Sequence, residues 1–179
     1  MACLALSTGR ALACKNVMGG IKAVYFADYG TLGDLSLTDG EITAFGGTPA
    51  FFEFDVKGSS GLEQTINASR ENGTVFYEQT LTLVLTKLDL LTQNELINII
   101  DARPYAVIED YNNNYLLIGA DNGADCNGGT ITTGVAAGDL TGFTITMAGQ
   151  EKLPAYFVPP SVLQGAVSAS FAAPTQITP

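Results

Sequence analysis

The chain has 179 residues, of which 46% are hydrophobic and 15% are charged, against roughly 25% charged residues in an average soluble domain. Its 8 Lys and Arg against 18 Asp and Glu give a net charge of −10. That balance argues against binding to nucleic acid, because affinity for phosphate comes mainly from cationic side chains. No apolar run reaches the roughly 20 residues of a membrane helix. The composition fits a subunit that covers apolar surface with other subunits, or simply a chain rich in Ala, Leu, Ile and Thr.

Residues 1–20 show neither helical nor strand periodicity, and we expect them to form an N-terminal arm. They lack the charged start and apolar centre of a signal peptide, so we expect folding in a cytoplasm. The three cysteines have no C-x-x-C spacing. Their odd count favours free thiols, and a bridge between Cys3 and Cys14 stays open.

Strand-forming residues first occur at 21–28, 41–45 and 51–57. The last two segments flank Gly46-Gly47-Thr48-Pro49, which predicts a hairpin with a flexible tip. Phe51, Phe52 and Phe54 crowd onto this hairpin, which is more aromatic surface than a lone hairpin normally shows to water. We therefore expect at least one of them at a subunit interface; the alternative is that all three face their own core.

The clearest alternation runs over residues 74–88, with residues 62–68 as a weaker strand before it. One alternate set is largely apolar, and the other is rich in Thr and includes Glu78, Thr80 and Thr82. This pattern predicts a long strand with one face on a core and one polar face. The polar face has three possible neighbours: the helix that follows, outer solvent, or the interior of an assembly.

A single helix is predicted from Thr92, with Glu95 at the capping-box spacing and an end near Arg103, before Pro104. Further strands are expected at residues 105–109, 115–118, 130–133 and 141–148. This order predicts a mainly β protein, an antiparallel β-sandwich or barrel with one flanking α-helix, over residues 21–153. Residues 154–179 contain five prolines and are predicted to be an extended Pro/Ala-rich C-terminal arm.

The absence of histidine removes Ser-His-Asp catalysis and the commonest transition-metal ligand. No nucleotide-binding fingerprint is present, so we predict no enzymatic activity, no cofactor and no metal. The carboxylates of Glu109 and Asp110 belong to adjacent strand residues, which face opposite ways, and no Trp offers a sugar platform. Residues 121–125 lack the ligand order of an EF-hand and favour an Asx turn.

From the helix onward the sequence resembles the tail tube, or major tail, proteins of tailed bacteriophages. The resemblance covers residues 62–158 and rests on element order and turn placement, as in residues 103–119, Asn122-Gly123, Gly128-Gly129-Thr130 and residues 138–146. It implies a β-sandwich with one flanking helix, six subunits to a ring, and rings stacked into a hollow tube through which DNA passes. It also implies a long hairpin and terminal arms that bridge rings.

On this resemblance the chain is a virion protein of the tail, assembled in the host cytoplasm. Its main partner is itself; sheath, baseplate or terminator proteins are further partners, and DNA passes without specific binding. The residues expected to face the lumen are Glu63, Glu71, Glu78, Thr80 and Thr82.

Three kinds of alternative stay open. A tail terminator, a connector or a capsid decoration protein would share this composition. A tube of a contractile injection system would share the fold. A carbohydrate-binding module is a candidate from another class, against which the absence of Trp weighs.

Overall fold

The computed structural model describes residues 9–11, 15–56 and 58–167. This part of the chain is mainly β, with 48% strand and 11% helix in two sheets that do not close into a barrel. The predicted antiparallel β-sandwich with a flanking helix is thereby confirmed. Cys3, Cys14 and the last twelve residues of the predicted C-terminal arm lie outside the described residues.

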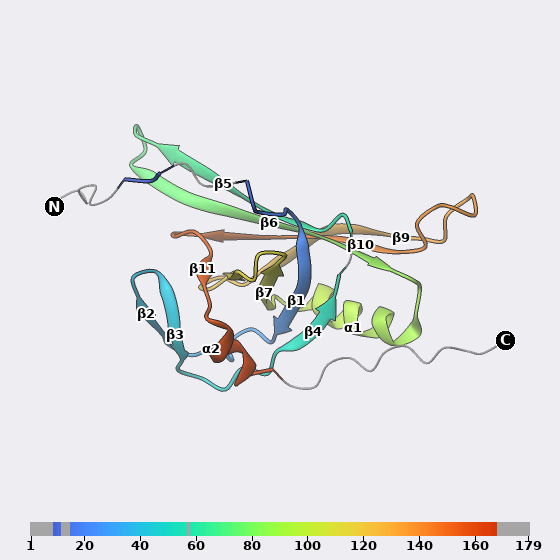
Figure 1. Cartoon of the computed structure of the whole chain (residues 1–179), viewed down its shortest axis with the longest axis horizontal. Coiled ribbons are helices and arrows are strands. Elements are labelled where there is room, and N and C mark those ends of the chain that lie inside the picture. The colour runs from blue at the N-terminus through green and yellow to red at the C-terminus, as the bar shows by residue number, and fades with distance from the viewer. Residues whose placement is uncertain (1–8, 12–14, 57, 168–179) are drawn as a thin grey trace.

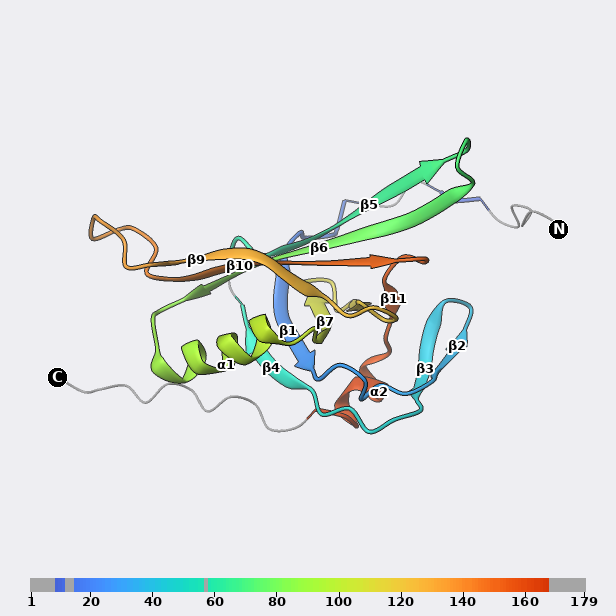
Figure 2. The same ribbon diagram turned by 180° about the vertical axis from the view of Figure 1, so that it is seen from behind.

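The strands form two layers (Figures 1 and 2). The seven-stranded sheet has the order β2 (Leu35–Thr38), β3 (Glu41–Phe45), β11 (Tyr156–Phe157), β8 (Tyr115–Ile118), β7 (Tyr105–Asp110), β1 (Ile21–Ala27) and β4 (Phe52–Asp55). The four-stranded sheet has the order β5 (Gly61–Ser69), β6 (Thr74–Thr86), β10 (Gly142–Glu151) and β9 (Asp125–Thr132). All pairings are antiparallel except the short one between β11 and β3.

Two helices accompany the sheets. Helix α1 (Leu90–Asp101) begins three residues earlier than a helix capped by Thr92, because its N-cap is Asp89, which accepts a hydrogen bond from Thr92 N–H at 3.4 Å. Helix α2 (Pro160–Gln164) carries proline at its first position, where the missing N–H has no helical partner to lose.

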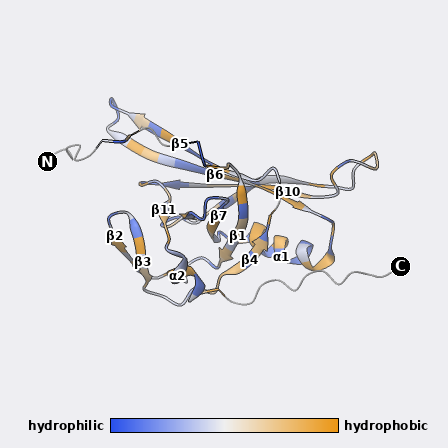
Figure 3. Cartoon of the chain, in the orientation of Figure 1, coloured by the Kyte–Doolittle hydropathy of each residue, from blue (hydrophilic) through white to orange (hydrophobic). Residues whose placement is uncertain are grey.

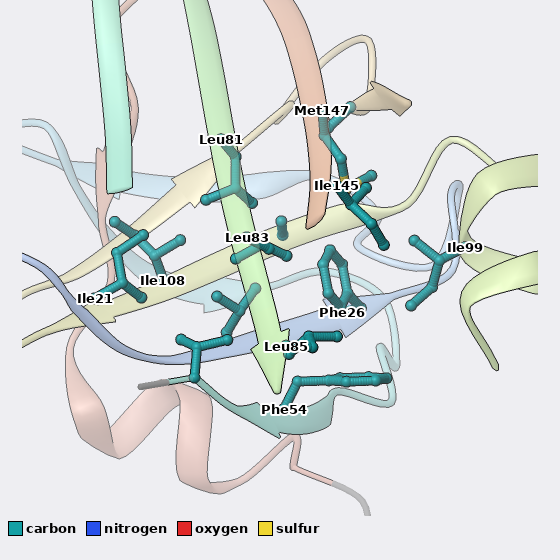
Figure 4. Close-up of a cluster of buried hydrophobic side chains, with 14 of the residues drawn as sticks. Ile21, Phe26, Phe54, Leu81, Leu83, Leu85, Ile99, Ile108, Ile145 and Met147 are labelled. Carbon is teal, nitrogen blue, oxygen red and sulfur yellow. The ribbon is translucent and has the colours of Figure 1, made fainter. Parts of the chain in front are cut away.

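The first core cluster lies between the two sheets (Figure 4). Leu81, Leu83 and Leu85 of β6 point into it on successive pleats, and Ile99 of α1 closes one end. This is the apolar set that the alternation of β6 predicts. Figure 3 shows both apolar and hydrophilic stretches along β5 and β6.

A second cluster covers the opposite face of the seven-stranded sheet. It joins Tyr25 and Val107 of that sheet to Val158 and Leu163, which are 3% and 2% exposed. Residues 154–167, which we expected to begin an extended arm, therefore form β11 and α2 and belong to the packed fold. As a result, the central strands β1 and β7 of the seven-stranded sheet are buried on both faces.

The predicted hairpin of residues 41–45 and 51–57 is wrong. β3 pairs with β2, whereas β4 pairs with β1 near the other end of the sheet. Gly46 and Gly47 instead donate their N–H groups to Asp34 O and Leu32 O, both at 2.8 Å, in a close backbone approach that leaves no room for a side chain on Gly47.

Candidate functional site

The most distinctive surface is the outer face of the four-stranded sheet, meaning the positions of β5, β6, β9 and β10 that point away from the first core cluster. Because side chains alternate along a strand, these are the residues between the buried ones. On β6 they include Glu78, Thr80 and Thr82, and on β10 they include Thr144 and Thr146. Threonine is the commonest residue of this face.

Four of the five residues predicted to line a lumen come together on this face. Glu63 of β5 lies opposite Thr80 of β6, and Glu78 and Thr82 are on the same side of β6. Glu71 does not join them, because it lies in the exposed turn between β5 and β6. Hairpin register, which brings Glu63 beside Thr80, follows from the turn between the strands.

The outer face is weakly acidic. Its outward positions within the four described strands include the carboxylates of Glu63, Glu78 and Asp125 but no Lys or Arg. Arg103 lies at the margin, beside the start of β9, with its Nε 3.4 Å from Asp125 Oδ1. Its guanidinium also lies 5.2 Å from the ring centre of Tyr29 and donates to Asn122 O, so local partners occupy this cation.

Helix α1 does not cover this face. Its buried residues, Leu96 and Ile99, belong to the first core cluster together with Leu83 and Phe143, on the opposite side of the same sheet. Of the three neighbours considered for the polar face, the helix is thereby removed. Outer solvent and the interior of an assembly are left.

The four-stranded sheet ends in two long strands, β5 with nine residues and β9 with eight. N–H groups of successive residues in a strand point to opposite sides. Val84 N–H donates to Ser60 Oγ, on the β5 side, and Lys87 N–H donates to Thr141 O, on the β10 side. The N–H groups of even-numbered residues in β6 therefore point towards β5, and those of odd-numbered residues point towards β10. Following the register across the sheet, the N–H groups of Gln64, Ile66 and Ala68 on β5 point to the open edge. On β9, those of Gly129 and Ile131 do the same.

Two of the three phenylalanines predicted at an interface are taken up by the chain's own core. Phe51 is fully buried in the second cluster, and Phe54 packs edge-on against Phe26, with ring centres 5.5 Å apart. Phe52 is 46% exposed and lines a cavity of about 490 Å³ between β4 and α1. It alone stays a candidate for a subunit contact.

A buried polar cluster centres on Glu109, which sequence reasoning considered only as half of a carboxylate pair. Its Oε1 lies 2.6 Å from Lys22 Nζ, and its Oε2 accepts a hydrogen bond from Tyr25 OH at 3.0 Å. Burial, together with the hydrogen bond to Glu109, raises the pKa of Tyr25 well above its usual range. Glu109, on β7, thereby ties β7 to Lys22 and Tyr25 of β1.

Two further carboxylates, Asp110 and Glu151, hold turns in place. Asp110 accepts hydrogen bonds from the backbone and side chains of Asn112 and Asn114. Burial raises the pKa of Asp110, but these hydrogen bonds together outweigh it, so the pKa is lower than the ordinary value. Glu151 accepts from the N–H groups of Asp121 and Asn122, which fixes the turn before β9. Burial nevertheless raises the pKa of Glu151.

No protein-family model, curated protein or solved structure matches the chain. No helix in the described ranges is long and apolar enough to cross a membrane. Across those same residues, no three His, Cys, Asp or Glu side chains gather in a group that could hold a metal ion.

Proposed function

We propose that the chain is a structural protein that pairs with copies of itself through the open edges of the four-stranded sheet, closes into rings, and stacks into a tube that conducts DNA, as tail tube proteins of bacteriophages do. The observation that carries the proposal is the combination of two long edge strands, β5 and β9, whose outer sides pair with no other described strand, and an outer face whose described strand positions include no Lys or Arg.

Long unpaired edges are rare in proteins that stay monomeric, because their free N–H and C=O groups act as templates for another strand. The edges of the seven-stranded sheet differ, since β2 and β4 have only four residues each. The strand directions also fit. Neighbouring strands of the four-stranded sheet are all antiparallel, so β5 and β9 at its two edges run in opposite directions. When β5 of one copy pairs with β9 of another copy in the same orientation, the antiparallel pattern continues across the two sheets.

A ring joined in this way has the outer face as one of its walls. If that wall is the inner one, DNA meets threonine hydroxyls and a few carboxylates and finds no cation to bind. The negative potential of the wall reaches only about 8 Å at physiological salt. The wall therefore lowers friction close to the DNA and does not act at long range.

Electron microscopy of the purified chain tests the proposal, with rings or tubes as the expected result. The Ala68→Pro variant removes an N–H group that points to the open edge of β5 while leaving its pairing with β6 intact. We expect this variant to fold with an unchanged circular dichroism spectrum and to form fewer or shorter assemblies, whereas Ala68→Ser assembles normally. Equal assembly by both variants, or a wild-type chain that stays monomeric, contradicts edge pairing through β5.

A further inference from the structure

An apolar groove lies between α1 and the open edge of β9. It has a volume of about 370 Å³, and its lining includes Leu96, Ile97, Ile100, Cys126, Ile131 and Phe143. Ile97, Ile100 and Ile131 are 49%, 47% and 65% exposed. None of the residues that line the groove is charged, so its chemistry suits an apolar occupant.

The β5–β6 hairpin has a matching apolar surface at the other end of the molecule. It extends beyond the seven-stranded sheet (Figures 1 and 2). Ile66 and Val75 lie on its inward face, the same face on which Leu62 packs against the core, and are 64% and 56% exposed. The inward positions of β5, which are Leu62, Gln64, Ile66 and Ala68, are all uncharged.

The groove and the hairpin lie on the same side of the four-stranded sheet, at its two opposite edges. Ile131 is an inward position of β9, because it lies opposite Phe143, a member of the first core cluster. A strand that pairs with β9 continues the sheet beyond Ile131, and its inward side chains then lie over Ile97 and Ile100 of α1. This step rests on the proposed function, since it requires that the sheets of two copies join.

We propose that the inward face of the β5–β6 hairpin of one copy, with Ile66 at its centre, fills the groove between α1 and β9 of the next copy. Each copy carries a net charge of −10, so close approach is least opposed where both surfaces are uncharged. These two surfaces meet that condition. The contact is heterologous, with different patches meeting on the two copies, which is the kind that generates rings.

Cys126 allows a direct test, because this half-buried free thiol lines the groove. The background chain carries Cys3→Ser and Cys14→Ser, which leaves Cys126 as its thiol. In this background, Ile66→Cys and Ala68→Cys, introduced one at a time, each place a second thiol on the inward face of β5. Oxidation of the assemblies should give a ladder of covalent multimers, since a disulfide forms only when the Cα atoms come within about 7 Å. Thr65→Cys, on the outer face of the same strand, is the matched control and should give none. Adding Cys126→Ser should abolish the ladder.

A second measurement does not depend on the position of one thiol. Ile97→Asp and Ile100→Asp put a carboxylate at the groove without disturbing the core, because both side chains are half exposed. We expect a large loss of assembly with an unchanged melting temperature of the dissociated subunit. Asn94→Asp, an exposed position of α1 that does not line the groove, should assemble normally.

The two measurements separate the contact from the proposed function. Rings or tubes that give no ladder and are insensitive to Ile97→Asp and Ile100→Asp would overturn the hairpin contact and leave the tube intact. A ladder from Thr65→Cys equal to that from Ile66→Cys would also overturn it. A chain that forms no assembly under any condition contradicts both proposals.

Discussion

Glu109 and Glu151 lie almost entirely out of water, each 4% exposed, but different donors hold them. Glu109 is paired with a cationic group and a phenol, whereas Glu151 receives only backbone N–H groups. An ionised carboxylate is costly to bury, and a nearby opposite charge offsets much of that cost. The two residues should therefore respond differently to neutralisation.

Glu109→Gln keeps the shape of the side chain and removes its charge. We expect the free energy of unfolding at neutral pH to fall by about 1.5 to 3 kcal/mol, the range for a hydrogen bond to a charged group. Chemical denaturation measures it. Glu63→Gln, on an exposed position of β5, is the control and should stay within about 0.5 kcal/mol of the wild type. A change as small for Glu109→Gln would mean that Lys22 and Tyr25 do not stabilise the carboxylate.

Glu151 predicts a pH dependence. Burial raises the pKa of its carboxyl above the ordinary value of 4.5, so the folded chain binds this proton more tightly than the unfolded chain does. The resulting stability is fully present below pH 4.5 and is lost as the pH rises through the folded pKa. Relative to Glu151→Gln, which does not titrate, the wild type should thus lose melting temperature as the pH rises from about 4 to 7. A difference between the two that stays constant over this range would contradict the shift.

At the level of elements, the sequence predicts strands better than it predicts their partners. β6 and β10 were found because one face of each is covered, so apolar and polar residues alternate. The pairing of β3 with β2 was missed, although Asp39-Gly40 before β3 is a strong hairpin signal, and both residues have positive φ. The Gly46-Gly47 pair led to the wrong prediction of a hairpin tip, because glycine favours close backbone packing as well as turns.

The C-terminal segment shows how an average hides local information. Five prolines over residues 154–179 indicate an extended arm. Within that segment, Val158 and Leu163 are nonetheless core residues, and proline begins α2 because position N1 needs no N–H. The average composition of a long segment does not show that two of its side chains, Val158 and Leu163, are buried. Their burial is seen only in the folded chain, where α2 packs against the second cluster.

The candidate site likewise has a part that the sequence predicts and a part that it does not. Alternation alone placed Glu78, Thr80 and Thr82 on one face, and the neighbouring strand added Glu63. The open edges and the groove beside α1 could not be predicted, because both depend on the order of strands in the sheet. That order brings together residues far apart in sequence, such as Ile100 and Ile131.

At the scale of the whole molecule, the two sheets have unequal surroundings. The seven-stranded sheet has a core cluster on each face, whereas the four-stranded sheet has one on its inward face only. The outer face is mostly polar, although Phe76 and Val84 of β6 also lie on it, and such a face suits a wall in contact with water. The described chain thus has a layer with a core cluster on each face behind a single layer that presents its outer face to the surroundings.

The charge of that face is the property on which the proposed conduction of DNA depends most directly. Replacing Glu78 and Thr80 with Lys changes the net charge by +2 and +1, a total of +3 per subunit, at two outward positions of β6. Repeated around a ring, these lysines form bands of cations, and phosphate binding to them releases counterions. We expect normal assembly but retention of DNA by purified tubes at low salt, and slower genome delivery by particles that carry them.

The matched control is Glu41→Lys with Thr43→Lys. It makes the same change of +3 at two exposed positions of β3, in the other sheet. Retention should be specific to the β6 variant and should weaken steeply as salt is raised towards 0.5 M, because counterion release governs it. If both variants retain DNA equally, net charge and not the outer face controls passage. If the β6 variant assembles correctly and delivers DNA at the normal rate, the outer face does not line the channel.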